Sequence, residues 1–307
     1  MDGGVAGDGG ATQLASGFVF AMDVRGNTVA YATLIENTVY RMNADGTAVQ
    51  PLFTATTAVG SVAVGPSIYF VQPGSFPGNQ AVLWQAGADG GATSVYSDYY
   101  GERVASDGTD IYWIDANRTL IGKRTPAGTV TTKTVPIPNA LTFEVDATHI
   151  YFAANDVSVA QAALYRLAKD FNSDAELVIG SQDVGGQGFY IAHVVTDDTK
   201  VYAAIGGAGG ATGKILRKNK DGTGTAESVV AFIGMEYGSS VALNNDTLYY
   251  TDGMTPQVVA IPKTATNGSG LRVHEGLANG LRSVVSNGYL YFYGSGPTGG
   301  VWRLPLP

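Results

Sequence analysis

The chain of 307 residues contains no cysteine. Disulfides, thiol catalysis and thiolate metal sites are therefore excluded. The absence fits a cytosolic or a bacterial extracytoplasmic protein better than a eukaryotic secreted one. Charge is scarce as well, because Asp, Glu, Lys and Arg make up 14% of the residues, against about a quarter in an average soluble domain.

Long basic and long apolar runs are also missing. The formal net charge is -8, which argues against a nucleic acid or an anionic membrane as the partner. No apolar run reaches the roughly 18 residues that would predict a transmembrane helix.

Turn-forming and aromatic residues are abundant instead. The 42 glycines are about twice the usual share of roughly 7%. Aromatic residues make up 10% of the chain and hydrophobic residues 45%. Many turns, many aromatics and few helix-forming charges predict an all-β protein with a packed core.

One short motif recurs along the chain. Residues 104–113 read VASDGTDIYW, which predicts a strand, a turn and a second strand that carries two aromatics. The second strand returns about every forty residues, a period typical of propellers. Its copies begin at Val29, Ile68, Ile111, Ile150, Val201, Leu248 and Leu290.

Each copy sits inside a larger unit. A short apolar run precedes it, and an apolar-x-basic strand, a turn such as Asp221-Gly222 and a fourth strand follow. Four antiparallel strands make one propeller blade, so we predict a seven-bladed β-propeller of four-stranded antiparallel blades. Six blades is the alternative, because the unit near Val194 has a weaker aromatic signature and a glycine-rich insertion at residues 206–210.

The two chain ends complement each other. The last unit stops at residues 304–307, where its turn and fourth strand should begin, and residues 8–16 resemble the corresponding residues 89–97 of the second unit. We therefore expect the N-terminal segment to join the last blade as its outer strand. The expected organisation is a flexible tail over residues 1–7 and a single propeller domain over residues 8–307.

The first ten residues contain no apolar segment, so they are not a signal peptide. We expect an extracytoplasmic protein, periplasmic or at the cell surface, whose export or lipoprotein signal has been removed. An ordinary cytosolic terminus is the alternative.

The IYW and IYF strands resemble the repeats of the YWTD, TolB, NHL and streptogramin-lyase-like propellers over residues 8–307. YWTD domains are protein-binding modules, so this resemblance implies a binding role. Streptogramin-lyase-like enzymes use a His/Glu constellation with magnesium. This chain has only His149, His193 and His274, no two of them close in sequence, which weakens the enzyme interpretation.

A ligand site is expected at the mouth of the central channel, in the loops that lead into the innermost strands. Aromatics with a few charges suit a sugar or small-molecule pocket. The expected ligand-binding residues are Tyr99, Tyr100, Glu102, Arg103, Tyr190, His193, Glu236, Tyr237 and Arg282. The tyrosines could instead fill gaps between blades, Glu102 and Arg103 could form salt bridges, and His193 could make a structural hydrogen bond.

Two repeated positions receive structural assignments. The tyrosines after the start of each motif copy, such as Tyr112 and Tyr291, are expected to pack between sheets. The basic residue of the third strand, such as Lys123 and Arg217, is expected on the surface.

Three functions remain open. The favoured one is a monomeric binding protein that holds a glycan or a partner protein through the loops around the channel. The second is a metal-assisted lyase or hydrolase, with His193 as base and Glu102 or Glu236 as metal ligand or acid. The third is a structural platform without a pocket. No catalytic or metal-binding residue is assigned, and a divalent cation in the central channel is the one cofactor left open.

Overall fold

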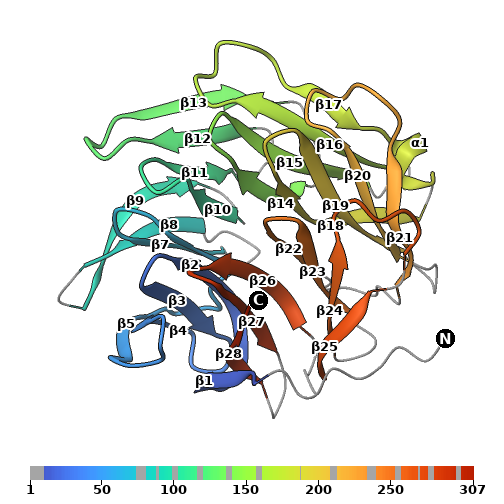
Figure 1. Ribbon diagram of the computed structural model, residues 1–307. Helices are drawn as coiled ribbons and strands as arrows, with labels where there is room; N and C mark the ends of the chain where they lie inside the picture. The colour runs from blue at the N-terminus through green and yellow to red at the C-terminus, as the bar shows by residue number, and fades with distance from the viewer. Residues whose placement is uncertain are drawn as a thin grey trace.

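The computed structural model describes residues 10–73, 81–87, 90–98, 103–115, 120–135, 140–156, 161–186, 188–207, 213–233, 240–252, 257–268, 270–275, 280–294 and 299–307. Seven four-stranded antiparallel sheets surround a central channel (Figure 1). One short helix, α1 (Ser181–Val184), follows the fourth sheet. The predicted seven-bladed β-propeller is confirmed, and the six-bladed alternative is wrong.

Blades 1 to 6 each use four consecutive strands. In blades 1 to 3 these are β2 (Val19–Arg25), β3 (Thr28–Thr33), β4 (Thr38–Asn43) and β5 (Gln50–Thr54); β6 (Ser61–Val64), β7 (Ile68–Gln72), β8 (Ala81–Ala86) and β9 (Ala92–Asp98); and β10 (Arg103–Ser106), β11 (Ile111–Ile114), β12 (Leu120–Arg124) and β13 (Val130–Thr134). In blades 4 to 6 they are β14 (Ala140–Val145), β15 (His149–Asp156), β16 (Gln161–Ala168) and β17 (Glu176–Ile179); β18 (Phe189–Thr196), β19 (Lys200–Gly207), β20 (Gly213–Asn219) and β21 (Glu227–Ile233); and β22 (Val241–Asn244), β23 (Thr247–Asp252), β24 (Gln257–Pro262) and β25 (Leu271–Glu275).

Blade 7 combines both ends of the chain. Its strands are β26 (Gly280–Ser286), β27 (Tyr289–Gly294), β28 (Gly300–Pro305) and, as the outer strand, β1 (Thr12–Ser16). Thr12 pairs with Arg303 and Gln13 with Trp302, and Figure 1 shows β1 beside β28. The predicted closure by the N-terminal strand is therefore confirmed, whereas residues 1–7 lie outside the described part of the chain.

The innermost strands form the wall of the channel. Each of them contacts the innermost strands of both neighbouring blades, and β26 of blade 7 contacts β2 of blade 1. The second strand of each blade is covered by the neighbouring sheets on both of its faces, which explains why its residues are continuously apolar instead of alternating. Ile68, Tyr69, Phe70 and Val71 of β7, for example, are all buried.

The repeated tyrosines lie between neighbouring sheets, as predicted. Tyr112 and Tyr151 are fully buried. The hydroxyl of Tyr112 donates to Asp107 in the turn before it (3.1 Å), and Asp107 also forms an ion pair with Lys169 of the next blade. Burial alone would raise the pKa of Asp107, but Lys169 and backbone N–H groups lower it to about 2.

The same inter-blade contact recurs twice. Lys220 of blade 5 pairs with Asp146 of blade 4, and Lys263 of blade 6 pairs with Asp197 of blade 5 (3.2 Å). Each lysine belongs to the turn after the third strand of its blade, so an acidic turn of one blade is joined to a basic turn of the next.

The prediction that the basic residue of the third strand is only a surface residue is wrong for several blades. Arg217 donates to the carbonyl oxygens of Lys263 (2.7 Å) and Ala265 in the next blade. Arg303 of blade 7 donates to Ala44 O of blade 1 (2.9 Å). These side chains join neighbouring blades because the third strand ends next to the adjoining sheet.

Among the described residues, no helix is long and apolar enough to cross a membrane.

The closure predicts a difference between two glycine substitutions in blade 7. A Cβ at Gly300 would collide with Ala15 O of β1, whereas a Cβ at Gly288 (φ 76°) would meet no atom within 4 Å. Gly288→Ala should therefore lower the free energy of unfolding by about 1 kcal/mol, the cost of a positive φ alone. Gly300 also has a positive φ (157°), so Gly300→Ala carries a backbone cost as well. It should lower the free energy of unfolding by about 1–3 kcal/mol more than Gly288→Ala, because the collision also forces β1 away from β28.

Chemical denaturation of both variants and the wild type measures these differences. Equal destabilisation by the two substitutions would contradict a contribution of the β1–β28 pairing to stability.

Candidate functional site

Two register positions of the innermost strands build the wall of the channel. We call the first the belt position. In each blade it pairs with the second-strand residue that lies two places after the repeated tyrosine (Ala30 takes the place of this tyrosine in blade 1). Its members, one from each blade, are Ala21, Ser61, Arg103, Thr142, His193, Ser240 and Arg282. The second, the carboxylate position, lies two residues further along each strand. Its members are Asp23, Ala63, Ala105, Glu144, Val195, Ala242 and Val284.

Several belt residues join neighbouring blades. The Ser61 hydroxyl donates to Val104 O (3.3 Å), and the Thr142 hydroxyl donates to Ala192 O (2.8 Å). The Ser240 and Ser283 hydroxyls are 3.0 Å apart. Each bond runs from one innermost strand to the next, so these polar side chains are satisfied inside the wall.

His193 makes the equivalent bond in blade 5. Its Nδ1 lies 2.9 Å from Val241 O of blade 6, so the proton is placed on Nδ1 and Nε2 is left as an acceptor. Among the described residues, Nε2 has no hydrogen-bond partner. Burial lowers the pKa of His193 to about 3, and the nearby positive charges of Arg282 and Arg103 act in the same direction. The imidazole is therefore neutral at physiological pH.

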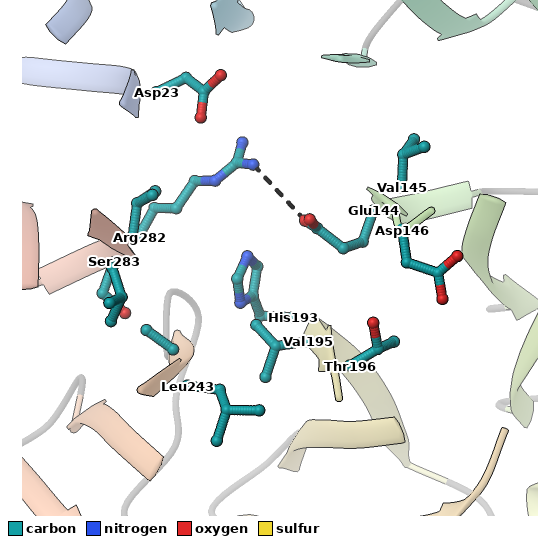
Figure 2. A pocket seen from close by; sticks show the side chains of 13 residues that line it. Asp23, Glu144, Val145, Asp146, His193, Val195, Thr196, Leu243, Arg282 and Ser283 are labelled. Carbon is teal, nitrogen blue, oxygen red and sulfur yellow. Dashed lines mark ion pairs between the residues drawn. The ribbon is translucent and has the colours of Figure 1, made fainter. Parts of the chain in front are cut away.

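A cavity of about 360 Å³ lies in the channel. It extends from the belt position toward the C-terminal ends of the innermost strands, and its walls come from blades 1, 4, 5, 6 and 7. The side chains of Asp23, Glu144, His193 and Arg282 point into the same space (Figure 2). Its volume lies within the roughly 300–1,000 Å³ of small-molecule sites.

The Arg282 guanidinium lies between two carboxylates (Figure 2). Its Nη2 is 3.9 Å from Oε2 of Glu144, too far for a hydrogen bond. Its Nε is buried and has no hydrogen-bond partner. Arg282 therefore supplies positive charge to the cavity while its hydrogen-bonding groups remain largely unused.

The two carboxylates are poorly stabilised in their ionised form. Burial raises the pKa of Glu144 to about 7; Arg282 opposes this shift and the negative charge of Asp23 adds to it. Burial also raises the pKa of Asp23, although Arg282 and a hydrogen bond from the Val64 N–H (2.7 Å) oppose the shift. Both groups are thus shifted toward their protonated, neutral form, because the protein stabilises their negative charge only in part.

The sequence-predicted site residues fall into two groups. Tyr99, Tyr100, Glu102, Glu236 and Tyr237 lie outside the described residues. Arg103, Tyr190, His193 and Arg282 lie on the innermost strands themselves, and not in the loops before them as the sequence analysis placed them.

The described candidates do not all share one place. His193 and Arg282 meet in the cavity, and the charge of Arg103 acts on His193. The Tyr190 ring lies instead against Gly206 of the paired strand, at a point where a Cβ would collide with it.

The sequence analysis missed Asp23 and Glu144. The repeat could have pointed to them, because the corresponding position of the five other blades holds alanine or valine. An acidic residue at a position that is small and apolar in the other blades indicates a role other than packing in the channel wall.

The described residues contain no group of three His, Cys, Asp or Glu side chains that could hold a metal ion. Glu102 and Glu236, the acidic residues proposed as metal ligands, lie outside that part of the chain.

The structure is similar to solved propellers of several kinds. Virginiamycin B lyase from Staphylococcus aureus superposes with a TM-score of 0.66 and 13% identity, covering 97% of this chain and 100% of that one. The WD40 repeats of RRP9 give a TM-score of 0.68 and 10% identity, covering 100% and 99%. YCF48 bound to the D1 peptide gives 0.64 and 12%, covering 97% and 96%. At these identities the likeness shows the fold alone.

No protein-family model matches the sequence, and no curated protein matches it either.

The Glu144 environment predicts a pH-dependent effect of Glu144→Gln. The folded protein keeps the Glu144 proton up to about pH 7, whereas the unfolded chain loses it near the ordinary value of 4.5. The contribution of Glu144 to stability therefore falls as the pH rises through this window. We compare the free energy of unfolding of the variant with that of the wild type at each pH. The difference, variant minus wild type, should be on the order of 1 kcal/mol larger at pH 8 than at pH 5.

Urea denaturation of both proteins at the two pH values measures this gain. Asp23 titrates in both proteins, so only its coupling to Glu144 enters the comparison. An identical difference at pH 5 and pH 8 would show that Glu144 titrates as an ordinary carboxyl.

Proposed function

We propose that this β-propeller is a binding protein that holds a glycan or a partner protein at the mouth of its channel. Propellers of the same fold include WD40 repeats, peptide-bound YCF48 and a lyase, so the fold permits the role without deciding it. The support comes from how the channel residues are used.

The observation that carries the proposal is the hydrogen bond between His193 and Val241 O. His193 is the one histidine of the chain in the channel wall, and it joins two blades in the same way as Ser61 and Thr142. His149 bonds to the neighbouring Thr148 instead, and His274 lies on an outermost strand. A histidine with a pKa of about 3 is a weak base at neutral pH. The chemistry present thus favours binding over catalysis.

An extracytoplasmic location remains part of the proposal. The absence of cysteine is compatible with a bacterial extracytoplasmic protein and equally with a cytosolic one.

The proposal predicts that aromatic residues at the channel mouth contribute to affinity. Tyr100→Ala combined with Tyr190→Ala should weaken binding of a glycan or protein ligand found by screening by about tenfold or more, because aromatic anchors dominate such contacts. Tyr165→Ala is a matched control, since Tyr165 stacks on Phe152 in a sheet away from the channel wall. Equal binding by the double variant and the wild type would remove this site from consideration.

A metal-assisted lyase or hydrolase is the alternative proposal. It draws on the unpartnered Nε2 of His193, which faces a cavity that also holds Glu144. The described residues do not fit a metal site, so a divalent cation would need Glu102 or Glu236. Calorimetric titration with magnesium, calcium and manganese tests this alternative. It expects binding that Glu102→Gln or Glu236→Gln abolishes, and the absence of any binding would discard it.

A further inference from the structure

We propose that the channel cavity binds a primary ammonium group beside Asp23 and Glu144, the two carboxylates that flank the Arg282 guanidinium. The group could belong to a small polyamine or to a lysine side chain of a partner. This inference rests on the proposed binding role. It adds a ligand class for the cavity, which lies below the channel mouth.

The first argument is the charge that the wall leaves uncompensated. Arg282 is shared between two carboxylates and hydrogen bonds to neither. Arg25 also lies near both, but its guanidinium is engaged by three backbone carbonyl oxygens: Val64 O (3.1 Å), Asp107 O (2.9 Å) and Ser106 O (2.6 Å). Buried carboxylates need charge and hydrogen bonds together. Asp23 and Glu144 accept hydrogen bonds from backbone N–H groups, but neither accepts one from Arg282.

The second argument is the set of acceptors that face the cavity. Asp23 accepts the Val64 N–H at Oδ2 and a second backbone hydrogen bond from Val24, and a carboxylate has about four lone-pair sites in all. Glu144 has Arg282 beside it only at 3.9 Å. His193 presents Nε2 as a neutral acceptor, because Nδ1 is bound to Val241 O. An ammonium group has three donors and no acceptor, which matches three acceptors from blades 1, 4 and 5.

The third argument is the shape of the cavity. Most of its remaining lining is apolar. The apolar residues are Val145, Val195, Ala242, Leu243, Val284 and Val285, and the polar ones are Asp146, Thr196 and Ser283. Such walls suit the methylene chain of an alkylamine, which would lie against them while its charged end reaches the carboxylates. An anion would have to lie beside both carboxylates in order to reach the Arg282 guanidinium, which stands between them. A sugar would find no aromatic platform among these wall residues.

Calorimetric titration of the full chain with 1,4-diaminobutane and with N-acetyl-lysine amide tests the proposal, with 1-butanol as the uncharged control. We expect both amines to bind and butanol not to bind. A preference for diaminobutane indicates a free polyamine as the natural ligand, and a preference for the lysine derivative indicates a partner side chain.

Two substitutions should act in opposite directions. Glu144→Gln should weaken amine binding by about tenfold or more, because a charge-assisted contact is lost. Arg282→Gln should tighten it, because the cation that competes for the carboxylates is removed. Glu176→Gln, at an exposed ion pair on the outer strand of blade 4, is the matched control and should leave binding unchanged. Thermal melts identify any variant that fails to fold, and the other variant then carries the test.

The affinity should also depend on pH. Glu144, with a pKa of about 7, is mostly protonated at pH 6 and mostly ionised at pH 8, whereas an alkylammonium near 10.4 keeps its charge. Binding should therefore tighten by about tenfold between these values. The other titratable or charged groups around the cavity are Asp23 and Arg25 of β2, Arg103 of β10, Asp146 directly after β14 with its partner Lys220, His193 of β18 and Arg282 of β26.

No amine binding at millimolar concentration would overturn the inference, as would binding that Glu144→Gln leaves unchanged or that Arg282→Gln weakens. The last result would indicate that Arg282 binds an anionic or hydroxyl group of the ligand. These substitutions lie below the mouth, so loss of amine binding with retained glycan or protein binding separates this inference from the proposed function.

Discussion

The pairing of β1 with β28 is the constraint on which the rest of the structure depends. It brings the two ends of the chain into one sheet and sets β26 of blade 7 against β2 of blade 1. Arg282 and Asp23 lie on these two strands, more than two hundred residues apart in sequence. The charged part of the cavity therefore exists only in the closed ring, and a blade lost from the ring would separate the arginine from one of its carboxylates.

Polar groups in the channel wall serve two purposes. Ser61, Thr142 and His193 use their hydrogen-bonding atoms on the backbone of the next blade, and the same register position supplies all three. Asp23 and Glu144, two residues further along, keep oxygen atoms directed into the cavity. The wall is thus held together by Ser61, Thr142 and His193 at one level, and at the next level its two acidic side chains face the cavity.

The comparisons extend this distinction. A lyase, WD40 repeats and a peptide-bound propeller all share the ring with this chain at 10–13% identity. Their common feature is the closed array of sheets. In this chain that array buries the repeated tyrosines. What differs among propellers is the set of side chains at channel and loop positions. A function for this chain must accordingly be argued from Asp23, Glu144, His193 and Arg282.

The sequence by itself determined the all-β class, seven blades, closure by the N-terminal strand and the buried role of the repeated tyrosines. Each of these follows from a periodic pattern, and periodicity is a local property that is copied along the chain. The residue pattern also singled out His193 and Arg282, which line the cavity, but placed them in loops, and it did not single out Asp23 and Glu144. Only the tertiary structure decided which side chains face each other across the channel, because the closed ring juxtaposes residues from blades 1, 4, 5 and 7 that no spacing in the sequence relates.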